Sequence, residues 1–258
     1  MQNSSPVDTP ISKGHALGSQ MCPKTLEEKE KMSRVPYRSS VGSLMYAMVC
    51  TRPDICQEVG LVSRYQTDPG LAHWQAVKRI MRYLKGTADY ALCYQGDKDL
   101  RLVGYSDVDH GGDLDERKST SGYVFLLSDG AISWSSKKQS CISLSTMEAE
   151  YVALASAAQE AVWLKRFLEH LLDITEDAEP VLVYYDSEAA ISSTKDPKFH
   201  CKTKYIDIKY NYARDMVKRK VVNVKYVSTK DMLADPLTKP LSRDAFVRHT
   251  RSQGLRRF

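Results

Sequence analysis

The spacing of apolar residues changes from strand-like to helix-like within residues 102–151, and this change limits the folds open to the chain. Three short runs have the β-branched and aromatic content, or the alternation, that strands favour. They lie at 102–105, 122–127 and 131–135. A Ser-Asp-Gly turn at 128–130 predicts a hairpin between the last two runs, and from about 144 to 172 the period is helical. The stretch therefore predicts three antiparallel strands followed by a long helix.

The chain after this helix alternates between further helices and strands. A continuous apolar run, Val181–Tyr185, is typical of a buried strand. The remaining elements that apolar spacing predicts are a helix from Ser187, a helix at about 206–218, a strand at 221–227 and a short helix that contains Asp235. The order β-β-β-α-β-α-α-β-α predicts an α/β fold, with a five-stranded mixed sheet flanked by helices.

The residues outside the predicted sheet domain, 98–240, differ in composition from one part to the next. Residues 1–36 are rich in Ser, Pro, Lys and Glu, which predicts an extended or disordered lead-in with a short helix at 26–32. Residues 37–97 hold three amphipathic runs and predict a small helical subdomain packed beside the sheet. Residues 241–258 carry five arginines and one aspartate and predict a basic tail.

Composition places the chain among ordinary globular proteins. Of its 258 residues 42% are hydrophobic and 27% are charged. The six cysteines form no CxxC pair and have no zinc-like spacing with histidine, which favours reduced thiols. No apolar run approaches the ~18 residues of a membrane span, and residues 1–15 lack the apolar core of a signal peptide. These features predict an intracellular protein of the cytoplasm or nucleus.

Positive charge is concentrated in two places, although the net charge is only +5. Residues 195–220 contain seven lysines and two arginines against three aspartates, and the arginine-rich tail adds more. Such patches suit a polyanionic partner. The alternative is a solvated face that keeps the protein soluble, and charge alone favours that alternative.

Four acidic residues occupy positions from which they can meet. Asp107 lies at the end of the first predicted strand and Asp186 directly follows Val181–Tyr185. Glu150 and Asp235 lie in helices that can reach the same edge of the sheet, where α/β proteins bind ligands. Four such carboxylates repel unless a cation lies among them, and Mg²⁺ or Mn²⁺ suits oxygen ligands. The alternative is that they are ordinary surface acids.

Long motifs in the chain resemble a known family. The stretches GYSDVDHGGDLDERKSTSGYVFLLSDGAISWSSKKQ, LSTMEAEYVAL, VYYDSEAAI, DPKFHCKTKYIDI and MLADPLTKPL resemble the ribonuclease H domain of copia-type retrotransposon Pol polyproteins. The earlier stretches VPYRSSVGSLMYAMVCTRPDICQEVGLVSRYQ and HWQAVKRIMRYLKGT resemble the segment that follows the reverse-transcriptase palm in those polyproteins. The resemblance covers nearly the whole chain. It implies a ribonuclease H-like sheet preceded by a connection-like helical segment.

The resemblance also implies roles for the four acids. Asp107, Glu150, Asp186 and Asp235 match the four family carboxylates, which are catalytic and hold two Mg²⁺ or Mn²⁺ ions. Glu150 is preferred to Glu148 because the Tyr-x-Ala-Leu pattern follows it. The implied reaction is hydrolysis of the RNA strand of an RNA–DNA hybrid. Proteins recognise such a hybrid by its backbone, its groove shape and the 2′-OH.

The basic segment completes the implied nucleic-acid site. The lysines assigned to it are Lys195, Lys198, Lys202, Lys204 and Lys209. The sequence departs from the family at 107–113, where the usual DADWAGD reads DVDHGGD and loses an aromatic residue, and at 204–208, where KHIDI reads KYIDI. These departures are expected to affect the rate of cleavage and the affinity for the substrate. His110, in the first of them, is expected to be a loop residue, because a hard-cation site prefers oxygen.

Two functions follow as hypotheses. The first is a metal-dependent endoribonuclease acting on RNA–DNA hybrids. The second is a domesticated, non-catalytic remnant, an effector-type protein that binds nucleic acid or a protein partner. No Tyr-x-Asp-Asp polymerase motif and no protease or integrase signature occurs, so the chain is expected to be a free-standing remnant of a larger polyprotein.

Overall fold

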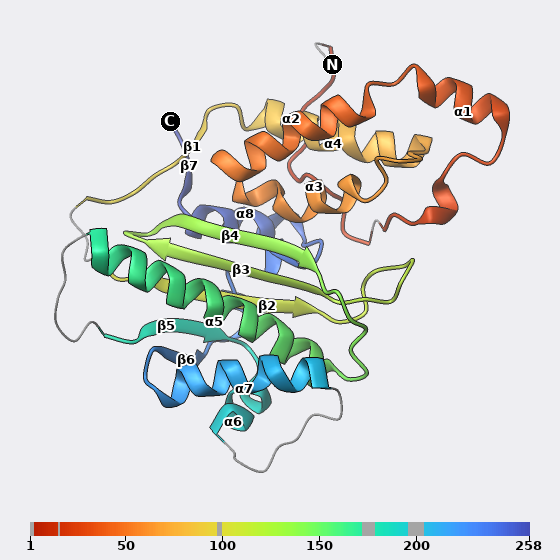
Figure 1. The fold of residues 1–258 in the computed structure, drawn as a ribbon. Helices are drawn as coiled ribbons and strands as arrows, with labels where there is room; N and C mark the ends of the chain where they lie inside the picture. The colour runs from red at the N-terminus through yellow and green to blue at the C-terminus, as the bar shows by residue number, and fades with distance from the viewer. Residues whose placement is uncertain (1–2, 15, 97–99, 172–178, 196–203) are drawn as a thin grey trace.

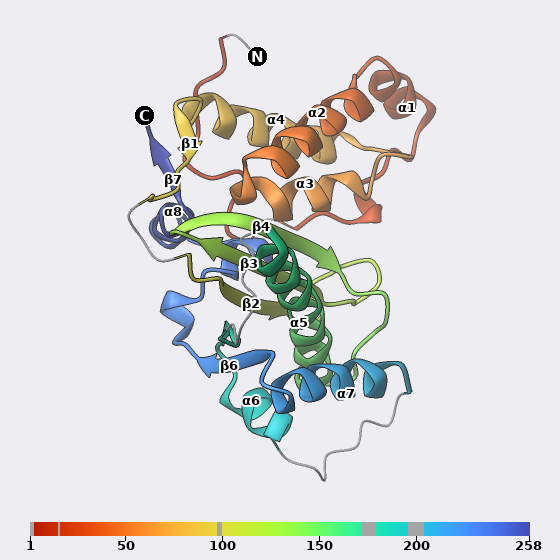
Figure 2. The same cartoon turned by 60° about the vertical axis from the view of Figure 1, so that its left-hand side comes forward.

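The computed structural model describes residues 3–14, 16–96, 100–171, 179–195 and 204–258. A helical part formed by the N-terminal residues lies against one edge of a mixed sheet, and the longest helix crosses one face of that sheet (Figure 1). The turned view shows the same arrangement, with the helical part beside β4 (Gly130–Lys138) (Figure 2). The α/β fold class expected from the sequence is confirmed.

The sheet has five strands, as predicted, in the order β4-β3-β2-β5-β6. β2 (Val103–Asp109), β3 (Thr120–Leu127) and β4 are antiparallel neighbours. β5 (Val181–Tyr185) and β6 (Val222–Tyr226) run parallel to β2. β5 has the predicted bounds. β2 extends four residues beyond its predicted end, so Asp107 lies within the strand rather than after it.

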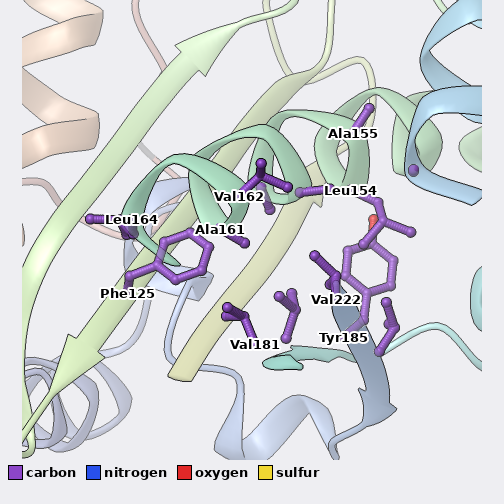
Figure 3. Packing of buried hydrophobic residues seen from close by; sticks show 14 of the residues in the cluster. Phe125, Leu154, Ala155, Ala161, Val162, Leu164, Val181, Tyr185 and Val222 are labelled. Carbon is purple, nitrogen blue, oxygen red and sulfur yellow. The ribbon is translucent and has the colours of Figure 1, made fainter. Parts of the chain in front are cut away.

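Three helices cover one face of the sheet. α5 (Thr146–Leu171) lies across it, and α6 (Glu188–Lys195) and α7 (Lys204–Lys218) lie beyond (Figure 1). Alanines on α5 let the helix approach the strands closely, since Ala157 and Ala161 are fully buried. Figure 3 shows Phe125 of β3 and Tyr185 of β5 on the sheet side of this core. Burial of these apolar side chains is the main term that stabilises the sheet domain.

The helical part contains the predicted helices. They are α1 (Leu26–Ser33), α2 (Tyr37–Cys50), α3 (Cys56–Ser63) and α4 (Leu71–Gly86). A capping box between Thr25 and Glu28 begins α1, and Pro53 starts the short turn between α2 and α3. Apolar residues of α2, α3 and α4 form a second core, separate from the core under α5.

The lead-in is largely extended, but it is bound to the helical part. Ile11 and Leu17 are buried, and Tyr65 OH donates a hydrogen bond to the Leu17 carbonyl at 3.1 Å. Arg79 Nη2 donates to Thr9 Oγ1 at 3.0 Å. Isolated apolar residues therefore anchor a segment whose composition resembles that of a free lead-in.

Residues 241–258 do not form a tail, which corrects the prediction. They fold into α8 (Arg243–Ser252) and β7 (Leu255–Arg257), and β7 pairs antiparallel with β1 (Tyr90–Leu92). Phe246, His249 and Thr250 are buried at helical spacing on one side of α8. The five arginines dominate the composition and hide this amphipathic pattern.

Five of the six cysteines are described, and each is a free thiol. In the described ranges no helix is both long and apolar enough to cross a membrane.

Candidate active site

Asp107 and Asp186 lie at the same end of two adjacent strands. β2 and β5 are parallel, and Tyr105 of β2 is in register with Tyr184 of β5. Asp107 and Asp186 each follow that pair by two residues. Burial and then the charge of Asp107 raise the pKa of Asp186 above its ordinary value. The two acids that come from different strands are therefore close enough to interact.

Glu150 reaches the same place from the beginning of α5. Tyr185 OH donates a hydrogen bond to the Glu150 carbonyl at 3.0 Å and ties this turn of the helix to the end of β5. Burial raises the pKa of Glu150, and the charges of Asp186 and Asp107 raise it further. Its Oε2 is buried without a hydrogen-bond partner among the described residues.

Asp235 approaches from the face of the sheet opposite α5, on the short helical turn η4 (Asp235–Leu237). Gly122 of β3, the register partner of Asp107, makes room for this turn. A Cβ at Gly122 would lie 2.7 Å from Thr238 Cγ2 and 2.9 Å from Leu237 Cβ. Burial and the charge of Asp107 raise the pKa of Asp235 well above its ordinary value.

Two residues that follow η4 bind the acids directly. The Thr238 hydroxyl donates to Asp107 Oδ2. Lys239 Nζ lies 3.4 Å from the same oxygen and 3.0 Å from Asp235 Oδ1. Burial lowers the pKa of Lys239, but the charges of Asp107 and Asp235 outweigh burial and the net shift is upward.

The carboxylates are more numerous than the sequence indicated. Asp109 lies two residues after Asp107 on β2. Burial raises the pKa of Asp109, the charge of Lys239 lowers it and the charge of Asp107 raises it, with a net upward shift. Sequence reasoning missed Asp109, Thr238 and Lys239 as members of the site. Strand spacing of two residues from Asp107, and helical spacing of four residues from Asp235, are the signals that could have found Asp109 and Lys239.

Comparison with known proteins identifies the family. The retrovirus-related Pol polyprotein from transposon TNT 1-94 of Nicotiana tabacum is 50% identical to this chain over 246 residues, which is 95% of this chain and 18% of that protein. The chain belongs to the copia-type retrotransposon Pol family. It spans about a fifth of that polyprotein's length. Its five-stranded mixed sheet, with the first three strands antiparallel, is the sheet that the family resemblance predicts.

Two further proteins are similar to this Pol-family chain. A secreted RxLR effector protein, number 161, of Plasmopara viticola is 53% identical over 133 residues, 52% of this chain and 94% of that protein. The N-terminal RNase H domain of a Mycobacterium tuberculosis protein is 18% identical, with a TM-score of 0.40. That match covers 60% of this chain and 99% of the solved chain. No protein-family model matches the chain.

The acids of this Pol-family chain are of the chemical type that binds hard divalent cations. Asp107, Glu150, Asp186 and Asp235 offer carboxylate oxygens, which Mg²⁺ and Mn²⁺ prefer, and Glu150 Oε2 is a buried acceptor that a cation can satisfy. Within the part of the chain that the structure describes, no three acidic, histidine or cysteine side chains are close enough together to coordinate one ion. Lys239 supplies positive charge in their midst.

The five lysines assigned to nucleic acid are only partly placed. Lys198 and Lys202 lie outside the described residues. Lys195 ends α6 and Lys204 begins α7, but their side chains are not described. Lys209 is half-buried on α7. Their assignment stays a prediction. His110 is exposed in the turn after β2, as expected of a loop residue.

Proposed function

We propose that this chain is a ribonuclease H-type hydrolase that cleaves the RNA strand of RNA–DNA hybrids, as part of a Pol polyprotein. One observation carries the proposal: four acids from separate parts of the chain lie near one another at one end of the sheet. Burial and mutual repulsion raise the pKa values of Glu150, Asp186 and Asp235. Raised carboxyl pKa values of this kind gather at sites that act on ligands.

In this proposal Asp107, Glu150, Asp186 and Asp235 are the catalytic residues and the ligands of two Mg²⁺ or Mn²⁺ ions. Bound ions of this kind supply an activated water and offset the negative charge that develops at phosphorus. The chain contributes rigidity. Asp107 is fixed by β2 and by the Thr238 hydroxyl, and it is only 4% exposed. Thr229 Oγ1 donates to Asp186 Oδ2 at 3.2 Å and orients that carboxylate.

The substrate in this proposal is held mainly by its phosphates. Lys195, Lys198, Lys202, Lys204 and Lys209 provide the positive charge. Such contacts give affinity without sequence preference. Discrimination of a hybrid from a DNA duplex then depends on groove shape and on the 2′-OH.

The second hypothesis, a non-catalytic effector-type protein, has weaker support. The effector of Plasmopara viticola matches about half of this chain. All four acids are present near one end of the sheet, an arrangement that supports catalysis more than a purely binding role. Catalysis therefore accounts for more of the observed arrangement.

A cleavage assay tests the proposal. The parent protein is incubated with a hybrid labelled on its RNA strand, with Mg²⁺ or with a chelator, and a DNA duplex of the same sequence serves as the control substrate. We expect RNA cleavage only with Mg²⁺ and only in the hybrid. Absence of cleavage with both Mg²⁺ and Mn²⁺ would contradict the proposal and favour the binding role.

A further inference from the structure

We infer that Lys239 is a built-in counter-cation of the acidic site, which holds Asp107 and Asp235 in the metal-free protein and is displaced when a divalent metal binds. The inference rests on the proposed metal site and adds a residue that regulates it. Its basis is the position of one ammonium group, 3.0 Å from Asp235 Oδ1 and 3.4 Å from Asp107 Oδ2.

The fold fixes the position of Lys239. Its backbone N–H donates to the Asp235 carbonyl at 3.2 Å, which continues the turn of η4. The neighbouring Ala234 and Leu237 are fully buried and anchor that turn. The Lys239 side chain is 33% exposed, and the carboxylates it meets are nearly buried. Water and salt therefore screen these ion pairs less than they screen pairs on the open surface.

Lys239 is also specific to this cluster. Among the described residues, it is the cation that forms ion pairs with two of the four acids, Asp107 and Asp235. Its positive charge offsets the negative charges of the two carboxylates, which would otherwise favour the binding of protons. The metal-free site can thus keep Asp107 and Asp235 close together without a bound ion.

Metal binding requires the ammonium group of Lys239 to move away from Asp107 and Asp235. A divalent ion coordinated by oxygens of Asp107 and Asp235 would occupy the position of the Lys239 ammonium group and would interact with the same two negative charges. Two cations between the same two carboxylates repel each other strongly in a partly buried site. Metal and Lys239 therefore compete, and the lysine lowers the metal affinity of the free protein.

Calorimetric titration with MgCl₂, without nucleic acid, tests the competition. Lys239→Met removes the ammonium group and keeps most of the length of the side chain. Lys230→Met, on the adjacent turn Thr229–Asp231, is the matched control, because Lys230 is exposed and its removal changes the net charge equally. We expect Lys239→Met to bind Mg²⁺ about 10-fold more tightly than the parent, or ~1.4 kcal/mol, and to melt at a lower temperature in chelator. Lys230→Met and Lys239→Arg should stay near the parent in affinity.

A measurement on the unaltered protein covers the case in which Lys239→Met does not fold. Brief acetylation of the parent, followed by mass spectrometry, gives the reactivity of Lys239 relative to Lys230. Displacement by Mg²⁺ should raise that ratio several-fold. An unchanged ratio, or equal or weaker Mg²⁺ binding by Lys239→Met, would overturn the inference and leave the proposed function standing. Absence of metal binding in both proteins would overturn the inference and the metal-dependent function together.

Discussion

The hydroxyl of Thr238 donates a hydrogen bond to Asp107 across 131 residues of sequence. This bond joins the turn after β6 to the central strand β2. It also places Lys239, the next residue, beside the same carboxylate. The geometry of the acidic site thus depends on how η4 docks on the sheet as much as on the strands.

Replacing Thr238 by Val should therefore loosen the site. The change removes the hydroxyl and leaves the buried Asp107 oxygen without this donor. The expected loss of stability is about 1–3 kcal/mol, measured by urea denaturation. Thr238→Ser retains the hydroxyl and is the control, and it should recover most of the stability. Equal stability of the Val variant and the parent would show that the bond does not hold Asp107.

Replacing Gly122 by Ala should push η4 away from the sheet. The added Cβ meets Thr238 Cγ2 at 2.7 Å and Leu237 Cβ at 2.9 Å, and both neighbours are buried. Overpacking of this kind costs about 1–3 kcal/mol, and we expect cleavage of the hybrid to fall as well. The free energy of unfolding and the cleavage rate measure the two effects.

Gly42→Ala is the matched control for that variant. Gly42 lies within α2, and a Cβ there meets no atom within 4 Å. This control should gain about 0.5–1 kcal/mol and leave cleavage unchanged. A Gly122→Ala protein as stable and active as the control would contradict the proposed docking of η4.

The pH dependence of stability should depend on Asp235. Burial and Asp107 raise its folded-state pKa above the ordinary value, so the folded protein binds the proton more tightly than the unfolded chain. Its contribution to stability is complete below the ordinary pKa and is lost as pH rises through the raised one. In chelator, Asp235→Asn should remove part of this loss, with a difference of at most ~1.4 kcal/mol per pH unit. Parallel stability curves for the two proteins between the ordinary pKa of 3.8 and the raised pKa of about 7 would refute the shift.

Hybrid binding should depend on the basic segment. Changing Lys202, Lys204 and Lys209 to Glu removes three positive charges and adds three negative ones. For every phosphate that the segment no longer neutralises, the slope of log K against log salt should flatten by ~0.7–0.9. The control changes three exposed lysines within residues 1–36, Lys13, Lys24 and Lys29, in the same way. If both triple variants bind the hybrid equally, the segment has no specific role in binding.

Sequence patterns are sufficient where a segment is apolar throughout. They predict Val181–Tyr185 with its observed bounds, because the run is wholly apolar between Pro180 and Asp186. They miss the end of β2, since Asp107 and Asp109 are polar residues within the strand. Asp107 is covered by residues that follow η4, far away in the sequence, and no local pattern shows this contact. Composition likewise predicts a tail at 241–258, because the few residues that bury one side of α8 are outnumbered by arginines and other polar residues.

Sequence and family motifs propose the acids of the site, but they do not point to Lys239 as the cation that pairs with two of them. Asp107 and Asp186 follow apolar runs, and the family motifs assign Glu150 and Asp235. Lys239 is one lysine among many in the sequence, and its role depends on a contact with Asp107 that only the folded chain creates. Pairings between distant residues are therefore the part that sequence reasoning leaves out.

Asp186→Asn tests most directly whether the four acids form the catalytic site. The change keeps the shape of the side chain and removes one negative charge from the proposed metal ligands. We predict a loss of at least ~100-fold in hybrid cleavage, or ~2.7 kcal/mol of transition-state stabilisation. Melting in chelator should stay the same or rise, because repulsion with Asp107 is relieved. An Asp186→Asn protein that cleaves the hybrid as fast as the parent would contradict the catalytic role of these acids.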